Sequence, residues 1–289
     1  MTSGNKSILQ INICVLLLGG TALFAKLINL PADDLTFFRS IFACLALISI
    51  MIITKSAFRL QSTEDYWLIL FTGLLTGGHW VAYFHAIQLS TVAVGIISLY
   101  TFPIMTSFLE PLLDHERIRF GNIVRAAVEF AGILLIVPDF ELSNQATAGV
   151  LWGLASAALF SIRNITVKKK LGHLSSLTTM CYQLFIISIM LLPFVSFQES
   201  LTIDNRFWLL VLLSVLFTAT PHVLLVASLR CLKATRASLI LCLHPLYSIL
   251  FAGMLISEIP SFKVISGGVL IFSISMYESI HVRVANSKN

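Results

Sequence analysis

The chain has 289 residues, of which 57% are hydrophobic and only 11% are charged, with a net charge of +5 and a mean hydropathy of +0.91. Soluble domains carry about 25% charged residues, so this composition excludes a water-soluble protein. We expect an integral membrane protein whose outer surface faces lipid.

No motif in the chain indicates a metal, a cofactor or a nucleic acid as a partner. The basic residues lie between long apolar segments, which fits membrane topology better than nucleic-acid binding. The five cysteines lie inside apolar runs without C-x-x-C or metal-ligand spacing, so we interpret them as small core residues. They are Cys14, Cys44, Cys181, Cys231 and Cys242.

The apolar residues gather in ten segments, each about as long as the 20 residues that a helix needs to cross a bilayer. The segments cover approximately residues 8–29, 35–54, 66–88, 92–113, 121–138, 147–167, 175–196, 207–229, 236–256 and 262–281. The first is long enough to span, so we do not interpret it as a cleaved signal peptide. Because hydrocarbon offers no partner for backbone polar groups, each segment is predicted to be a helix. The predicted fold class is an all-α integral membrane protein with ten transmembrane helices.

The basic residues between the segments predict the orientation, because cytoplasmic loops carry an excess of lysine and arginine. With the N-terminus inside, the outer side holds only Arg206 and Lys263. The inner side holds Lys6, Lys55, Arg59, Arg117, Arg119, Lys168, Lys169, Lys170, Arg230, Lys233, Arg236, Arg283 and Lys288. Arg163 is interpreted as a further topology anchor beside the three lysines. We expect a multi-pass protein of a bacterial-type inner (plasma) membrane with both termini in the cytoplasm.

The second half of the chain repeats the first at an offset of 142 residues. The matched pairs are Pro103 with Pro245, Glu116 with Glu258, Leu99 with Leu241, Thr76 with Thr218, Leu74 with Leu216 and Gly95 with Ala237. The repeat predicts two five-helix units, residues 1–141 and 142–289. Since five is odd, the second unit must enter the membrane upside down. Inverted repeats of this kind occur in secondary carriers, which bind substrate near the middle of the membrane.

These residues resemble the drug/metabolite transporter superfamily, specifically carriers with two EamA domains. The resemblance rests on GGTALFAK, LTFFRSIFACLAL, AIQLSTVAVGIISLYTFPIMTSFLE and DHERIRFGNI in the first half, and on ASLILCLHPLYSILFAGMLISEIPSFKVISGGVLIF in the second. It implies a ten-helix carrier of small organic solutes. Pro103 and Pro245 match the family proline, Glu116 and Glu258 the glutamate after it, and Arg39 the arginine early in the second helix. Arg125 stands where the family has glycine, as at Gly267, which argues against tight packing of the fifth helix.

Aromatic and polar residues on the third and fourth helices of each unit are the candidates for a substrate pocket. His79, Trp80 and Tyr83 share one side of a helix, because they are spaced by three and four residues. Prolines 103, 221 and 245 free backbone carbonyls that a neighbouring helix or a ligand can satisfy. The other candidates are Tyr100, Tyr182, Gln183, His222, His244 and Tyr247. The alternative is that these aromatic residues pack or lie at the membrane interfaces.

Charged residues inside the segments are candidates for coupling or gating. Glu129 and Arg125 are either a pair that neutralises itself within one helix or part of the coupling. Glu110 either binds a proton or reaches water at the inner side. Lys26 and Arg39 either snorkel or pair with nearby acids, or form an electropositive vestibule for anions.

Gly95 and Gly267, with Pro103 and Pro245, are candidate hinge or packing residues, because small residues let helices approach closely.

The repeat and the resemblance together predict a secondary active transporter that moves a small organic metabolite by alternating access. An aromatic pocket with histidines and few fixed charges suits an amino acid or a related solute, and export is the expected direction. Coupling to a proton or to an exchanged solute stays open, as does the oligomeric state. The alternative is a channel or a non-transporting scaffold. An intramembrane enzyme is less favoured, because no H-E-x-x-H or clustered Ser, His and Asp set is present.

Overall fold

The structure is a computed structural model that describes residues 3–56, 58–60, 62–115, 118, 120–136, 144–197, 205–229, 240–241 and 243–286. This part of the chain is helical and contains no strand, as the apolar segments predict. The α-helices are α1 Ser3–Thr21, α2 Phe24–Leu27, α3 Ala32–Ile53, α4 Thr63–Leu89, α5 Val92–Leu99, α6 Phe102–Leu113, α7 Phe120–Ile136, α8 Gln145–Lys170, α9 Ser176–Leu191, α11 Asn205–Ser214, α12 Thr220–Leu229, α14 His244–Ile256 and α15 Phe262–Asn286. A 3₁₀ turn, η1, covers Leu192–Phe194, and a π-helical turn, η2, covers Val215–Ala219.

Seven described segments are long and apolar enough to cross a membrane. They are Ser7–Leu27, Ala32–Ile53, Thr63–Leu89, Val92–Leu113, Gln145–Lys170, Ser176–Phe194 and Asn205–Leu225. Each of the seven coincides with a predicted span. The apolar helices His244–Ile256 and Phe262–Ile274 are shorter, and α7 has 17 residues.

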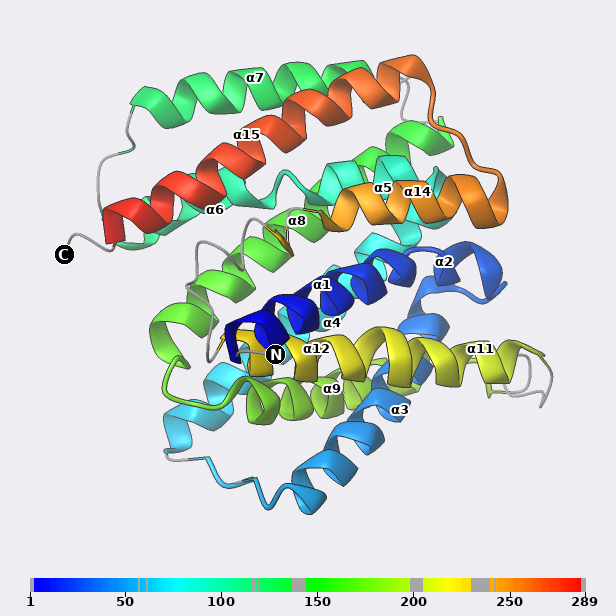
Figure 1. Ribbon diagram of the computed structural model, residues 1–289, viewed down its shortest axis with the longest axis vertical. Helices are drawn as coiled ribbons and strands as arrows, with labels where there is room; N and C mark the ends of the chain where they lie inside the picture. Colours follow the sequence, from blue (N-terminus) through cyan, green and yellow to red (C-terminus); the bar gives the residue numbers. More distant parts are fainter. Residues whose placement is uncertain are drawn as a thin grey trace.

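Helices from the two halves of the chain pack against each other in matching pairs (Figure 1). α3 packs on α9, α5 on α14 and α7 on α15, and each of these pairs joins a helix to its own counterpart in the repeat. In the repeat, α4 corresponds to α12 and α8 to α1, so the pair α4–α8 is the counterpart of the pair α12–α1. This pattern is the one that a pseudo-two-fold axis between the halves would produce. The boundary predicted between the halves, at residues 141 and 142, lies outside the described residues.

The predicted helix over 92–113 is interrupted in the structure. α5 ends at Leu99, Tyr100 and Thr101 form a turn, and α6 begins at Phe102. Pro103 occupies the first turn of α6, where a missing N–H costs nothing because no helical partner exists there. Pro245 occupies the equivalent place in α14, after a turn at Leu243. Each half therefore carries a helix break just before its repeated proline.

α7 packs closely on α15, although Arg125 replaces the glycine expected from the resemblance. Gly132, about two turns further along α7, faces Gly267 so closely that a Cβ atom added to Gly267 would lie 2.5 Å from the carbonyl oxygen of Gly132. The expectation of loose packing was wrong, because a glycine at a different position of the same helix allows the close approach. Figure 1 shows the two helices side by side, α7 in green and α15 in orange to red.

Candidate functional site

Arg39 lies in the interior, between helices of the two halves. Only 3% of the residue is exposed, and its guanidinium carbon lies 4.0 Å from the ring centre of Trp80 and 5.3 Å from that of Phe84. Its Nε donates a hydrogen bond of 2.7 Å to the hydroxyl of Thr218 in η2. The expectation that Arg39 snorkels or pairs with acids at the outer end of its helix was wrong. The ring of Trp80 and the hydroxyl of Thr218 hold it inside, and it forms no ion pair with any described residue.

In and after the π-helical turn η2, backbone carbonyls that would accept hydrogen bonds within a regular helix accept them from side chains. Pro221 lacks an N–H, and the carbonyl of Phe217, four residues before it, accepts a hydrogen bond of 3.1 Å from the hydroxyl of Thr21. The carbonyl of Thr218 accepts from Nδ1 of His222 at 2.6 Å. Single π-helical turns occur frequently at functional sites. Here the turn aligns Thr218 with Arg39 and holds His222 beside it.

His79 joins α4 to α8 through Ser156. The Ser156 hydroxyl donates to the backbone carbonyl of His79 at 3.0 Å and lies 2.7 Å from Nδ1 of the same residue. Since this hydroxyl has one hydrogen, Nδ1 of His79 must carry a hydrogen and donate it to Ser156. The His79 ring stacks on Phe160 at 4.6 Å and faces Tyr83 at 6.4 Å. The buried hydroxyl of Tyr83 has no hydrogen-bond partner among the described residues.

Arg163 is a residue of this region that sequence reasoning missed. Its Nη2 donates to the side-chain oxygen of Gln183 at 2.7 Å, and its Nη1 donates to Asn164 at 3.0 Å. Gln183 is fully buried and donates in turn to the hydroxyl of Thr72 at 3.0 Å. The sequence grouped Arg163 with the three lysines as a topology anchor, but the structure shows it bound to Gln183 and Asn164, about two turns before the end of α8. The distance of Arg163 from the end of the predicted helix was a sequence signal that separated it from the three lysines, but we gave more weight to its closeness to them in the chain.

Arg39, Arg163, His79 and His222 belong to one cluster. Arg39 joins Trp80 of α4 to Thr218, which also contacts His222. Gln183 joins Arg163 to Thr72 of α4, the helix that carries His79. We call this set, with Trp80, Tyr83, Gln183 and Thr218, the central cluster. It combines residues of α3, α4, α8, α9, η2 and α12, so both halves contribute to it.

The two helix breaks meet beside each other. The Tyr100 hydroxyl, in the break of the first half, donates to the carbonyl of Leu241 in the second half at 3.2 Å. The rings of Tyr100 and His244 are 5.8 Å apart, and Nε2 of His244 donates to the carbonyl of Leu18 at 3.0 Å. Tyr247 packs against Gly19 of α1 and stacks on Phe251. The carbonyl of Leu241, four residues before Pro245, is thus satisfied by a side chain of the other half.

Glu258 connects the end of α14 to the start of α5. Its Oε1 accepts a hydrogen bond of 2.5 Å from the backbone N–H of Val92. This N–H belongs to the first turn of α5, where it has no partner within the helix and where the helix dipole favours a carboxylate. The glutamate implied by the resemblance therefore caps a helix of the other half. Its counterpart, Glu116, lies outside the described residues.

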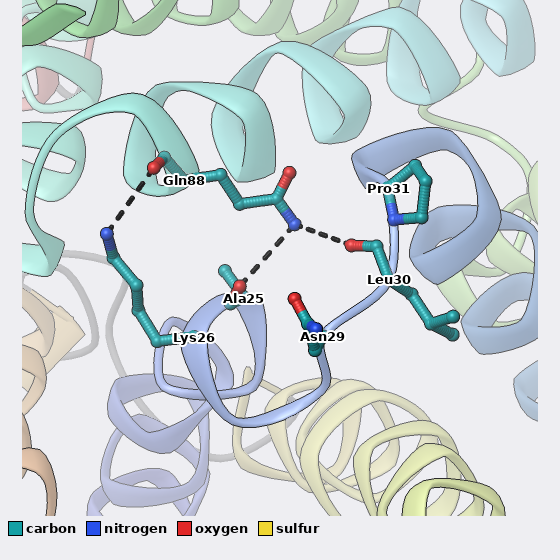
Figure 2. A pocket seen from close by; sticks show the side chains of 6 residues that line it. All are labelled: Ala25, Lys26, Asn29, Leu30, Pro31 and Gln88. Atoms are coloured by element: carbon teal, nitrogen blue, oxygen red, sulfur yellow. Dashed lines mark hydrogen bonds between the residues drawn. The ribbon is translucent and has the colours of Figure 1, made fainter.

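Tyr182 and Lys26 lie apart from the central cluster. The Tyr182 hydroxyl donates to the carbonyl of Phe58 at 2.9 Å in an exposed setting. Nζ of Lys26 donates to the carbonyl of Ser90 at 2.8 Å, just after the end of α4. Gln88 donates to the carbonyl of Leu30 at 2.8 Å. Figure 2 shows Lys26 and Gln88 at the edge of a hollow of about 420 Å³, whose lining residues are Ala25, Lys26, Asn29, Leu30, Pro31 and Gln88.

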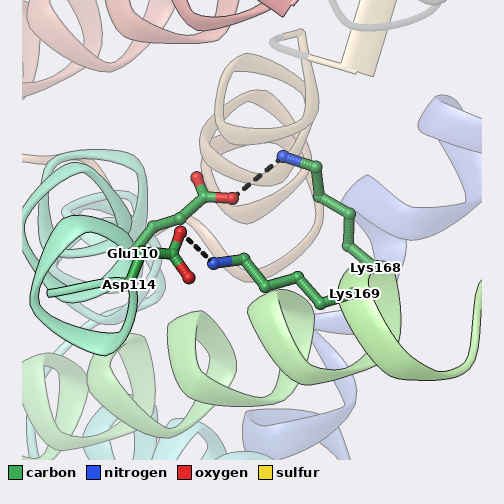
Figure 3. A network of polar contacts seen from close by, with 4 residues as sticks. All are labelled: Glu110, Asp114, Lys168 and Lys169. Carbon is green, nitrogen blue, oxygen red and sulfur yellow. Dashed lines mark hydrogen bonds and ion pairs between the residues drawn. The ribbon is translucent and has the colours of Figure 1, made fainter. Parts of the chain in front are cut away.

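Glu110 forms an ion pair at one end of the helical bundle. Its Oε1 lies 3.0 Å from Nζ of Lys168, and Asp114 pairs with Lys169 one turn further on (Figure 3). All four side chains are partly exposed. The structure therefore places Glu110 away from the central cluster, in contact with Lys168 of α8.

The pair predicted between Arg125 and Glu129 lies on α7, also outside the central cluster. Glu129 is buried, with 2% of the residue exposed. Arg125 donates to Asn122 and lies 5.4 Å from the ring centre of Tyr277. Gly95 lies against Ile87, where an added Cβ atom would approach a side-chain carbon to 2.5 Å. Gly95 is thus a close-packing residue between α4 and α5.

Comparisons with known proteins agree with this arrangement. The model of the EamA-like transporter family matches residues 5–137 and 147–276. The chain is 23% identical over 273 residues to the uncharacterized transporter YxxF of Bacillus subtilis, covering 92% of this chain and 87% of that one. It is 25% identical over 246 residues to the uncharacterized transporter YdfC of the same organism, covering 82% and 78%. A solved crystal structure with 18% identity superposes with a TM-score of 0.65 over 97% of this chain and 99% of that chain.

Proposed function

Because the chain belongs to the EamA-like transporter family, and is therefore a multi-pass membrane transporter, we propose that it is a secondary carrier working by alternating access. It moves a small organic metabolite, an amino acid or a related solute, with export as the expected direction. The protein lies in a bacterial-type inner membrane with ten spans and both termini in the cytoplasm. Residues 1–141 and 142–289 form the two inverted repeats.

The observation that carries this proposal is the pair of helix breaks that meet between the halves. Tyr100 of one break bonds to Leu241 of the other, and Glu258 of the second half caps α5 of the first. Such contacts link the movement of one half to that of the other. Discontinuous helices at the interface of two repeats are typical of carriers that expose a central site alternately to each side.

The central cluster is the proposed substrate site, because both halves contribute to it and it lies between them. Trp80, Tyr83 and His79 supply aromatic surface, and the Tyr83 hydroxyl has no partner among the described residues. A buried hydroxyl without a partner is costly, and a bound solute would supply one. Tyr100 and His244 are proposed to line the path at the breaks, with Tyr182 and Tyr247 as more peripheral candidates.

Counterflow in proteoliposomes tests the carrier mechanism. Vesicles containing the purified protein are loaded with unlabelled solute and diluted into a trace of the labelled one. A carrier accumulates label transiently, because each outward turnover is followed by an inward one. A channel gives a flux that neither saturates nor accumulates label, and a scaffold gives none. Thermal-shift screening of a metabolite collection would first select the solutes to test.

Two acids are proposed for coupling or gating, and their settings differ. Glu129 is buried on α7, whereas Glu110 is paired with Lys168 and partly exposed. A pH step across liposomes containing the wild type, Glu110→Gln or Glu129→Gln separates them. Loss of the response to the step in one variant assigns coupling to that acid. An unchanged response in both variants rejects proton coupling through either.

A further inference from the structure

The central cluster contains the guanidinium groups of Arg39, which is buried, and of Arg163, which is half-buried, and no carboxylate. Arg39 contacts Trp80, Phe84 and Thr218, and Arg163 contacts Gln183 and Asn164. Within the part of the chain that the structure describes, neither arginine forms an ion pair. The nearest described neighbours are neutral amides, hydroxyls and aromatic rings.

Three acids of the described residues contact other groups. Glu110 pairs with Lys168, Asp65 pairs with His173 at 3.1 Å, and Glu258 caps α5. Arginine stays protonated in proteins, and a buried charge is costly unless it is paired. Neither guanidinium is therefore paired with an acid among the described residues, and an anionic ligand would supply such a partner.

The guanidinium groups also have hydrogen-bond donors to spare. Only Nε of Arg39 is used, so neither of its terminal nitrogens bonds to a described residue. Arg163 uses both terminal nitrogens but leaves its buried Nε without a partner among the described residues. The planar donor set of arginine matches a carboxylate, which accepts two parallel hydrogen bonds.

We propose that the central cluster binds a small organic carboxylate with a net negative charge, recognised by Arg39 and Arg163 with Trp80 against its apolar part. This proposal rests on the carrier function above and narrows its substrate class. A zwitterion fits less well, because its ammonium group would find no acid among the described residues of the cluster.

Ligands that differ in charge but share a body test the proposal. The full chain in lipid nanodiscs is titrated with 3-phenylpropionate, L-phenylalanine and 2-phenylethylamine, and in a second series with succinate, L-aspartate and 1,4-diaminobutane. Binding is read from the ligand-dependent rise in the unfolding temperature. At least one of the two net anions, 3-phenylpropionate or succinate, should bind more tightly than its zwitterionic and cationic partners. Equal binding within both series, tightest binding by a zwitterion or an amine, or no binding by either carboxylate would overturn the proposal.

Variants of the arginines locate the effect. Arg39→Gln and Arg163→Gln should each weaken carboxylate binding about tenfold to a hundredfold, the range expected for a lost hydrogen bond between charged groups. Lys170→Gln is the matched control, because it removes an exposed positive charge from the same helix as Arg163. Binding that is unchanged in both arginine variants would contradict the assignment.

Gln183→Glu keeps the test decisive if an arginine variant fails to fold. The new carboxylate would lie where the Gln183 oxygen now accepts from Arg163, and would act as a built-in anion. The ligand-free variant should unfold at a higher temperature than the wild type and should bind the carboxylate at least tenfold more weakly. Unchanged carboxylate affinity in this variant would count against a role of Arg163 in recognition.

The two proposals can fail separately. Counterflow of a labelled amino acid without any binding of the two carboxylates would leave the carrier function standing and reject the anion site. Arginine-dependent carboxylate binding without counterflow of the same carboxylate would keep the anion site and reject the carrier mechanism.

Discussion

Two regions of α8 carry positive charge in opposite ways. Lys168 and Lys169 are partly exposed and each is paired with an acid of the α6 region. Arg163, five residues earlier and about 7.5 Å deeper along the helix, is held by two neutral amides and has no acid partner among the described residues. The lysine charges are paired and in contact with water, so breaking one of these ion pairs should change the free energy of unfolding little. Arg163 is half-buried without an acid partner among the described residues, and a charge in such a setting is costly and is a candidate for a functional role.

The largest effect on transport is expected when the aromatic ring that contacts Arg39 in the central cluster is removed. Trp80→Ala takes away the ring that lies 4.0 Å from Arg39. A desolvated cation–π contact contributes about 2 kcal/mol or more, so transport should fall about 30-fold or more. Counterflow measures the rate, and the amount of folded protein is followed by size-exclusion chromatography.

Trp67→Ala is the matched control for Trp80→Ala. Trp67 lies on the same helix but is 68% exposed, against 7% for Trp80, and its loss should leave transport unchanged. Full activity of well-folded Trp80→Ala would show that the cluster is packing and not a site.

A second change acts on the arginine of α8 through its neighbour. Gln183→Leu removes the oxygen that accepts from Arg163 and the amide that donates to Thr72. Loss of a hydrogen bond to a charged group costs about 1.5–3 kcal/mol, so we expect transport to fall at least about tenfold.

Thr72→Val serves as the control for Gln183→Leu, because it removes only the neutral hydrogen bond to Gln183. Its effect on counterflow should be smaller. Equal losses of transport in the two variants would mean that the hydrogen bond to Arg163 contributes no more to transport than the one to Thr72.

The sequence predicted the helical fold and the repeat well, and it predicted the cluster only in part. Long apolar runs specify helices directly, because the backbone has no other solution in hydrocarbon, whereas the break before Pro103 was not predicted, since residues 92–113 were expected to form one span. Five residues predicted to line a pocket belong to the central cluster, namely His79, Trp80, Tyr83, Gln183 and His222. Their role as a substrate site remains a prediction.

The position of the arginines was not predictable in the same way. Whether Arg39 snorkels or turns inward depends on Trp80 and Thr218, which lie 41 and 179 residues away in the chain. Arg163 was assigned to the lysine group because they are neighbours in sequence. Arg163 differs from the lysines in its distance from the end of α8. The partners that hold the two arginines include residues of other helices, which the neighbouring sequence does not reveal.

The contact between the helix breaks should matter less than the cluster itself. Tyr100→Phe removes one neutral hydrogen bond, to the carbonyl of Leu241, and keeps the ring against His244. Such a bond contributes about 0.5–1.5 kcal/mol, so transport should change about threefold to tenfold while ligand affinity stays constant. A fall in affinity with an unchanged turnover rate would instead assign Tyr100 to the substrate site.

The smallest effect is expected in the lysine region. Glu110→Gln and Lys168→Gln each break an exposed ion pair, which contributes about 1 kcal/mol or less and is screened by salt. We therefore expect unfolding temperatures within a few degrees of the wild type at low salt and equal to it at about 1 M salt. The double variant should be no less stable than either single one, since the charges interact mainly with each other. If Glu110→Gln abolished transport while Lys168→Gln did not, the carboxylate would have a role beyond the ion pair. Glu110 would then count among the functional groups, and the lysine end of α8 would no longer be only a solvent-exposed ion-pair region.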